Sequence, residues 1–111
     1  MGESAFYECN QLEHIFIGNE VRDIGPKAFM KCYSLSNFNF GNNLKVIYKD
    51  AFKEDFNLMA INLPKGIIKV EQEAFKGCTK GVVTIPCTCS FEKESFAGCP
   101  DFIPFIPVDN D

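Results

Sequence analysis

Six cysteines and a single histidine are the side chains of this 111-residue chain with the greatest potential for chemistry. A cysteine thiolate can act as a nucleophile or a metal ligand, and a nearby histidine can accept the thiol proton. Four of the cysteines have the same sequence context, because each follows a phenylalanine by three residues. These four are Cys9, Cys32, Cys78 and Cys99. Their regular placement predicts an inward structural position, where a thiol contributes volume rather than reactivity.

The other two cysteines and the histidine give no catalytic or metal-binding pattern. Cys87 and Cys89, in "IPCTCSF", lie outside the regular spacing, and we expect them to be the most exposed thiols. Their spacing does not match a zinc-ribbon C-x-x-C knuckle, and no second ligand cluster follows. His14 is expected on the outer surface of a strand. Phosphate-binding loops and nucleophile elbows are absent from the sequence. The sequence therefore predicts a protein that is not an enzyme and has no cofactor or metal.

The elements that position these side chains are repeated along the chain. An Ala-Phe pair recurs in three steps of 23 residues, and a Ser-Phe pair follows after 21 more. After each Phe comes a short apolar alternation, such as Leu35, Phe38 and Phe40, and then a turn residue, such as Gly41. A second alternation, such as Leu44 and Ile47, completes the unit. Alternation with period 2, rich in β-branched and aromatic residues, indicates strands.

Strands this short bury their apolar faces only when equivalent units stack on one another. A unit of 23 residues is too short for a helical hairpin repeat, which needs about 33. We predict a mainly β solenoid, a stack of about four to five 23-residue coils with short parallel strands and little helix. The repeats occupy residues 1–99, and a Pro-rich cap or tail occupies 100–111. The units start near residues 5, 28, 51, 74 and 95, and their phenylalanines form an internal column.

The unit "NEVRDIGPKAFMKCYSLSNFNF" resembles the BspA-like class of leucine-rich repeats, which reads roughly V-x-x-I-x-x-x-A-F-x-x-C-x-x-L-x-x-I-x-I-P. The resemblance extends from residue 5 to about 99. Asp55 stands where this class has Cys, and Gly81 stands where it has Leu, so we expect these two places to be the loosest in the stack. Glu20 and Gly66 stand where the ordinary leucine-rich repeat has asparagine.

The resemblance also implies a role. Proteins similar to this are mostly exposed on the surface of mucosal bacteria and parasitic protists, where they are associated with adhesion to host proteins. It implies a non-catalytic protein–protein interaction module of a cell-surface, adhesin-like protein. The alternative is an intracellular leucine-rich-repeat scaffold or regulatory protein, because "MGESAFYECN" shows no signal peptide.

Net charge and hydrophobicity exclude two kinds of binding partner, nucleic acid and the membrane interior. The formal net charge is −4 and no Lys/Arg run is present, which argues against nucleic acid. No apolar run approaches the roughly 20 residues of a membrane helix, which argues against membrane insertion.

The four regularly placed cysteines, Cys9, Cys32, Cys78 and Cys99, are expected to form a column and leave two redox states open. Reduced thiols that pack as small apolar groups are favoured, and bridging of Cys9 to Cys32 or of Cys78 to Cys99 is the alternative.

The outward residues of the longer strands form the predicted protein-binding face. Asn offers donors and acceptors together, and an exposed Phe is a typical apolar anchor. The alternative is a solvated sheet surface that binds no partner. The predicted binding residues are His14, Phe16, Asn37, Asn39, Asn62 and Thr84, with Ala60 beside them.

The two ends of the stack are expected to differ. The first unit opens with an unpaired edge at "ESAFYECN", which predicts self-association through the N-terminal end or else truncation from a longer array. Pro100, Pro104 and Pro107 cannot donate to a strand ladder, so we expect the tail to end the stacking. The Phe and Ile residues between these prolines are expected to fold back over the last coil.

Overall fold

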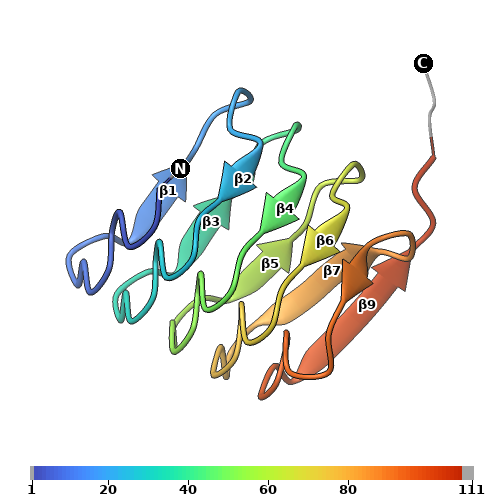
Figure 1. The fold of residues 1–111 in the computed structure, drawn as a ribbon. Helices are drawn as coiled ribbons and strands as arrows, with labels where there is room; N and C mark the ends of the chain where they lie inside the picture. Colours follow the sequence, from blue (N-terminus) through green and yellow to red (C-terminus); the bar gives the residue numbers. More distant parts are fainter. Residues whose placement is uncertain (1, 109–111) are drawn as a thin grey trace.

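Each of the first four repeats contributes one strand to each of two parallel sheets, because each has two short alternating segments separated by turns, and the fifth contributes a strand to one of them. The computed structural model describes residues 2–108 (Figure 1). Sheet A has the strand order β1-β3-β5-β7-β9, and sheet B has the order β2-β4-β6-β8. The strands are β1 His14–Phe16, β2 Asp23–Ile24, β3 Asn37–Asn39, β4 Val46–Ile47, β5 Ala60–Asn62, β6 Lys69–Val70, β7 Val82–Pro86, β8 Ser90–Phe91 and β9 Asp101–Phe105.

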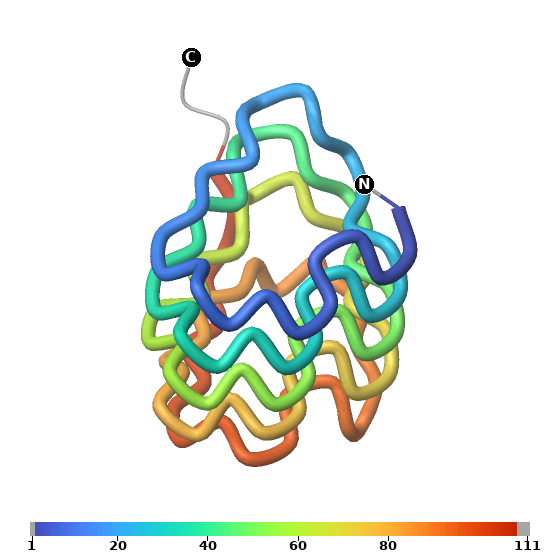
Figure 2. The backbone as a smooth tube through the Cα atoms, turned by 90° about the vertical axis from the view of Figure 1, so that its left-hand side faces the viewer, coloured from blue at the N-terminus to red at the C-terminus, as the bar shows by residue number. Residues whose placement is uncertain are grey.

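This arrangement confirms the predicted β solenoid. All strand pairs are parallel, and the register follows the repeat: Phe16 pairs with Asn39, and Asn62 pairs with Thr84. Figure 2 shows the successive coils following one another with the same outline. Residues 2–108 contain no helix, and therefore none long and apolar enough to cross a membrane.

The core is built around the predicted column of phenylalanines. Phe6, Phe29, Phe52, Phe75 and Phe96 stack in order, with ring centroids 5.1, 5.3, 4.9 and 5.4 Å apart and nearly parallel planes. The three middle rings are fully buried, whereas Phe6 at the open end is 37% exposed. Ring spacing close to the spacing of paired strands, about 4.8 Å, lets one aromatic residue per coil fill the interior without gaps.

Left-handed backbone recurs at the corner that carries each phenylalanine. The residue two places after the Phe has a positive φ in all five coils, at Glu8, Lys31, Glu54, Gly77 and Gly98. The corner is thus a repeated tight turn and not a helical segment. The first four of these turns also donate backbone N–H groups to the next coil; for example, Phe52 N donates to Ala74 O at 2.7 Å. The corners therefore add backbone hydrogen bonds between the coils, outside the sheets.

The structure differs from the sequence-based prediction at Gly81 and in the Pro-rich tail. Gly81 is not a loose place, because a Cβ added there would lie 2.7 Å from Cδ1 of Ile61. The neighbouring coil has already filled the space that a leucine would take. The predicted Pro-rich tail begins with a strand, since Asp101–Phe105 is β9 and pairs with β7. Residues 109–111 of that tail lie outside the described part of the chain.

The two open edges of the stack are β1 and β2 at one end and β9 and β8 at the other. In the first coil Ile15 and Ile17 are only partly buried, whereas Phe38, which pairs with Ile15 in the next coil, is in the core. The N-terminal end thus presents apolar side chains together with unpaired strand edges. Self-association through this end stays a prediction.

Candidate functional site

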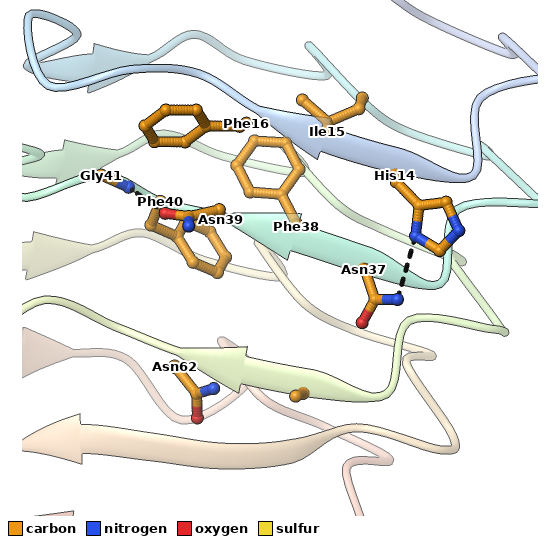
Figure 3. A pocket seen from close by; sticks show the side chains of 10 residues that line it. His14, Ile15, Phe16, Asn37, Phe38, Asn39, Phe40, Gly41 and Asn62 are labelled. Carbon is orange, nitrogen blue, oxygen red and sulfur yellow. Dashed lines mark hydrogen bonds between the residues drawn. The ribbon is translucent and has the colours of Figure 1, made fainter.

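The outer face of sheet A carries a hollow of about 560 Å³ (Figure 3). It extends over β1, β3 and β5 and contains five of the six predicted binding residues. Phe16 is exposed, with 63% of its surface open. Thr84, on β7, does not line the hollow, although it pairs with Asn62. The lining residues are His14, Ile15, Phe16, Asn37, Phe38, Asn39, Phe40, Gly41, Ala60 and Asn62.

The amide of Asn39 is held in one orientation by the turn that follows β3. Gly41 N donates to Asn39 Oδ1 at 2.9 Å. Gly41 has a φ of 67°, and an added Cβ would collide with the carbonyl oxygen of Gly18 in the preceding coil. Only glycine meets both conditions without strain. The glycine therefore fixes the amide, and the Nδ2 hydrogens of Asn39 remain available at the surface.

A second amide is fixed by the histidine on the neighbouring strand. Asn37 Nδ2 lies 3.0 Å from His14 Nδ1. An amide nitrogen donates, so His14 Nδ1 accepts and the neutral imidazole carries its hydrogen on Nε2. The pair then offers Asn37 Oδ1 as an acceptor and His14 Nε2–H as a donor. Asn62, one strand beyond Asn39, has no side-chain hydrogen bond within residues 2–108.

Four residues that line the hollow were missed by the sequence-based prediction. The apolar alternation predicts inward core positions for Ile15, Phe38 and Phe40 and a turn at Gly41, and all four line the hollow. Phe38 and Phe40 are indeed almost completely buried. The signal that could have identified Gly41 is its position two residues after Asn39, because an Asx-type turn needs a free N–H there.

The lining has no charged residue, since it includes no Lys, Arg, Asp or Glu. An uncharged site of amides, one imidazole and an aromatic ring can exchange hydrogen bonds and bury apolar groups. It has no carboxylate for proton transfer or for a hard metal ion. In residues 2–108 no group of three or more His, Cys, Asp or Glu side chains could hold a metal ion.

The cysteine column lies away from this hollow, and all six cysteines are free thiols. Three of them donate to the carbonyl oxygen of the phenylalanine in the preceding coil. The donors are Cys32, Cys78 and Cys99, with Sγ–O distances of 3.1, 3.4 and 3.6 Å.

Burial keeps most of these thiols protonated. It raises the pKa of Cys32 to about 12, raises that of Cys99 to about 11, and raises the pKa of Cys78 as well. Cys89 was predicted to be exposed but is buried, and this burial raises its pKa to about 11. Its thiol donates to Ser90 O at 3.5 Å. Cys87 is exposed as predicted. A protonated, buried thiol is a poor nucleophile, so the column acts as packing.

Asp55 replaces cysteine in the third coil and is fully buried. Its Oδ1 accepts from Cys32 N at 2.8 Å, whereas Oδ2 has no hydrogen-bond partner among the described residues. Burial raises the pKa of Asp55 to about 9, and the bond from Cys32 offsets only part of this effect. The acid is therefore neutral at pH 7 and stands between two protonated thiols, Cys32 and Cys78.

A family model described as "BspA type Leucine rich repeat region" matches residues 1–103 in 6 copies. This match covers nearly the whole chain. The chain is a BspA-type leucine-rich repeat protein. Within this chain, cysteine occupies the equivalent position in the other four coils, so Asp55 is a departure from the chain's own repeat.

Two solved structures have the same fold as these BspA-type repeats. A leucine-rich cell surface protein from Faecalibacterium prausnitzii matches with a TM-score of 0.87 and 25% identity over 94% of this chain and 29% of its own. A leucine-rich repeat protein from T. pallidum matches with a TM-score of 0.83 and 25% identity over 92% of this chain and 49% of its own. No curated protein matches significantly. The BspA-type chain thus spans less than half of either solved protein.

Proposed function

We propose that this chain is a non-catalytic protein-interaction module of a cell-surface, adhesin-like protein and binds its partner through the outer face of sheet A. The observation that carries the proposal is the hollow, which joins an exposed Phe16 to asparagine amides already held in place. Aromatic side chains in partly enclosed sites are the usual anchors of protein interfaces. The description of the F. prausnitzii neighbour as a cell surface protein supports the proposed location.

The test is capture of partners from extracts of the source cells by the immobilised chain. The comparison is a triple variant, Phe16→Ala, Asn39→Ala and Asn62→Ala, which changes only exposed side chains. The matched control is Phe56→Ala, an exposed phenylalanine outside the hollow that stacks on Tyr33. We expect the wild type and the control to retain the same proteins, and the triple variant to lose them. Equal capture by all three would contradict the proposal.

One observation favours the intracellular scaffold as the second candidate. All six thiols are free, as is usual in a reducing compartment. Titration of the natural protein under denaturing, non-reducing conditions separates the two candidates. Six reactive thiols would favour the intracellular role, and fewer than six would favour export. Labelling of intact source cells with a reagent that cannot cross the membrane tests the location directly.

A further inference from the structure

We propose that the hollow on sheet A binds an uncharged, extended peptide segment of the partner, which lies along β3 and packs an apolar side chain against Phe16. This inference rests on the proposed function, because it describes what the interaction face recognises. Its three supports are the absence of charge in the hollow, the spacing of two amides on β3, and the hydrogen-bonding groups that those amides leave free.

The first support is charge. None of the lining residues is ionised as a carboxylate, ammonium or guanidinium group. A charged ligand group entering the hollow would lose water without gaining an opposite charge, which is unfavourable. The ligand segment that fits the hollow is therefore neutral.

The second support is spacing. Asn37 and Asn39 are two residues apart on β3, so their side chains point to the same face. With a rise of about 3.3 Å per residue, equivalent points on the two residues repeat at about 6.6 Å. An extended peptide has the same two-residue period. Successive peptide groups on one side of such a segment therefore meet one asparagine each.

The third support is the orientation of the free groups. Asn39 Oδ1 already accepts from Gly41 N, which leaves its Nδ2 hydrogens for a carbonyl group of the ligand. Asn37 Nδ2 already donates to His14, which leaves its Oδ1 for an N–H group of the ligand. A donor at Asn39 and an acceptor at Asn37 complement the two polar groups of a peptide backbone. Because the amides are already held, binding costs little additional side-chain ordering.

Phe16 provides the apolar contact. It pairs in register with Asn39 on the adjacent strand and is 63% exposed. A side chain that projects from the bound segment toward β1 would cover this ring. Figure 3 shows Phe16, Asn39 and Asn62 on three successive strands around the hollow. The preferred segment therefore contains an apolar residue beside its bound peptide groups.

A neutral sugar is the competing ligand, because amides and an aromatic ring also bind sugar hydroxyl groups and ring faces. The two-residue spacing on β3 and the separate donor and acceptor favour the peptide. The experiment below therefore includes a sugar as a competitor, with displacement by the sugar counted against the proposal.

The test selects peptides with the whole 111-residue chain as bait. A random heptapeptide library displayed on phage is selected on the wild type after removal of phage that bind the Phe16→Ala variant. Enriched sequences are synthesised with capped ends, and their affinities are measured by fluorescence anisotropy. We expect uncharged peptides with an apolar residue, whose binding weakens at least tenfold in Phe16→Ala and in Asn39→Ala. The control Phe56→Ala is expected to bind as the wild type does.

Four outcomes would overturn the inference: no enriched peptide, enrichment of charged peptides, equal binding by the Asn39→Ala variant, or displacement by millimolar lactose. Thermal unfolding of each variant shows whether it is folded, and all the substituted side chains are exposed. The proposed function has a separate test in partner capture. If capture depends on the sheet A face while no neutral peptide binds, this inference fails and the proposed function stands.

Discussion

The inside and the outer face of the same coils follow different rules. Inside, Phe29, Phe52 and Phe75 occupy equivalent positions and are fully buried, with consecutive ring centroids 5.3 and 4.9 Å apart. Outside, the equivalent positions of sheet A change from strand to strand. In register they are Phe16, Asn39, Asn62, Thr84 and Ile103.

The difference has a physical cause. Each interior ring must fit the ring above and the ring below, so a change of size at one level leaves a gap or a clash at two others. An outward side chain of sheet A meets solvent and one neighbour on each side, and its replacement disturbs no stack. The repeated residues therefore specify the fold, and the unrepeated ones are free to specify a partner.

Replacement of an interior ring is expected to have the largest effect. Phe52→Ala removes a ring that stacks on Phe29 and Phe75 and also meets the edges of Phe38 and Phe40. We expect a loss of about 3–5 kcal/mol in the free energy of unfolding, measured by urea titration. The matched outer variant, Phe16→Ala, should lose no more than about 1 kcal/mol because its ring is largely exposed. Similar losses in the two variants would remove the distinction between inside and outside.

Gly41 links the two regions, because it packs against the preceding coil and also orients Asn39. Gly41→Ala places a side chain at a φ of 67° and against the carbonyl oxygen of Gly18. We expect a loss of about 2–3 kcal/mol in thermal or chemical unfolding, together with weaker partner binding. Gly2→Ala is the control, since an added Cβ there meets nothing within 4 Å. An unchanged stability in Gly41→Ala would show that the turn tolerates a side chain.

Asp55 is the one residue in the column of interior cysteines that is not a cysteine, and its effect on stability should depend on pH. Burial raises the pKa of this acid in the folded state to about 9, from an ordinary value of 3.8. The folded chain therefore binds more protons than the unfolded chain between these two values. The contribution of Asp55 to the free energy of unfolding is then most favourable below about pH 4. It falls as the pH rises toward 9, by no more than about 1.4 kcal/mol per pH unit.

Asp55→Cys restores the repeat and should remove this contribution to the pH dependence. A thiol at this position can pack and donate to a backbone carbonyl as Cys32, Cys78 and Cys99 do. We expect a gain of about 1–2 kcal/mol at pH 7, because a buried oxygen without a partner is removed. Urea unfolding of both proteins at pH 5, 7 and 9 measures the gain and the slope. A slope that persists unchanged in the variant would assign the pH dependence to other groups.

The sequence predicts the interior better than the outer face of sheet A, because the interior residues repeat from coil to coil and the outward residues do not. Equivalent positions in the repeat reveal which residues stack, so the phenylalanine column and the parallel strands could be read from spacing alone. The outward position of Phe16 and Asn39 also follows from alternation. The hollow itself does not, because it depends on hydrogen bonds such as Gly41 N to Asn39 Oδ1, and these occur once and not in every coil.

Deviations from the repeat were also hard to predict. Cys89 lies outside the pattern, and its burial depends on how the shortened last coil packs. At Gly81 the missing leucine is replaced by the neighbouring Ile61, which no single repeat reveals. Proline content alone suggested that the stacking would end at residue 100, yet β9 continues it.

Pro104 makes the two ends of the molecule unequal. Cys87 N donates to Phe105 O, so the polar groups of Phe105 face β7 and those of Pro104, one residue earlier, face the open side of β9. Proline has no N–H, so the open side lacks a hydrogen-bond donor at that residue. A strand arriving there would form an incomplete ladder, whereas none of the three residues of β1 at the opposite end is a proline. The open side of β9 therefore offers an incoming strand one hydrogen bond fewer than a strand without proline would offer.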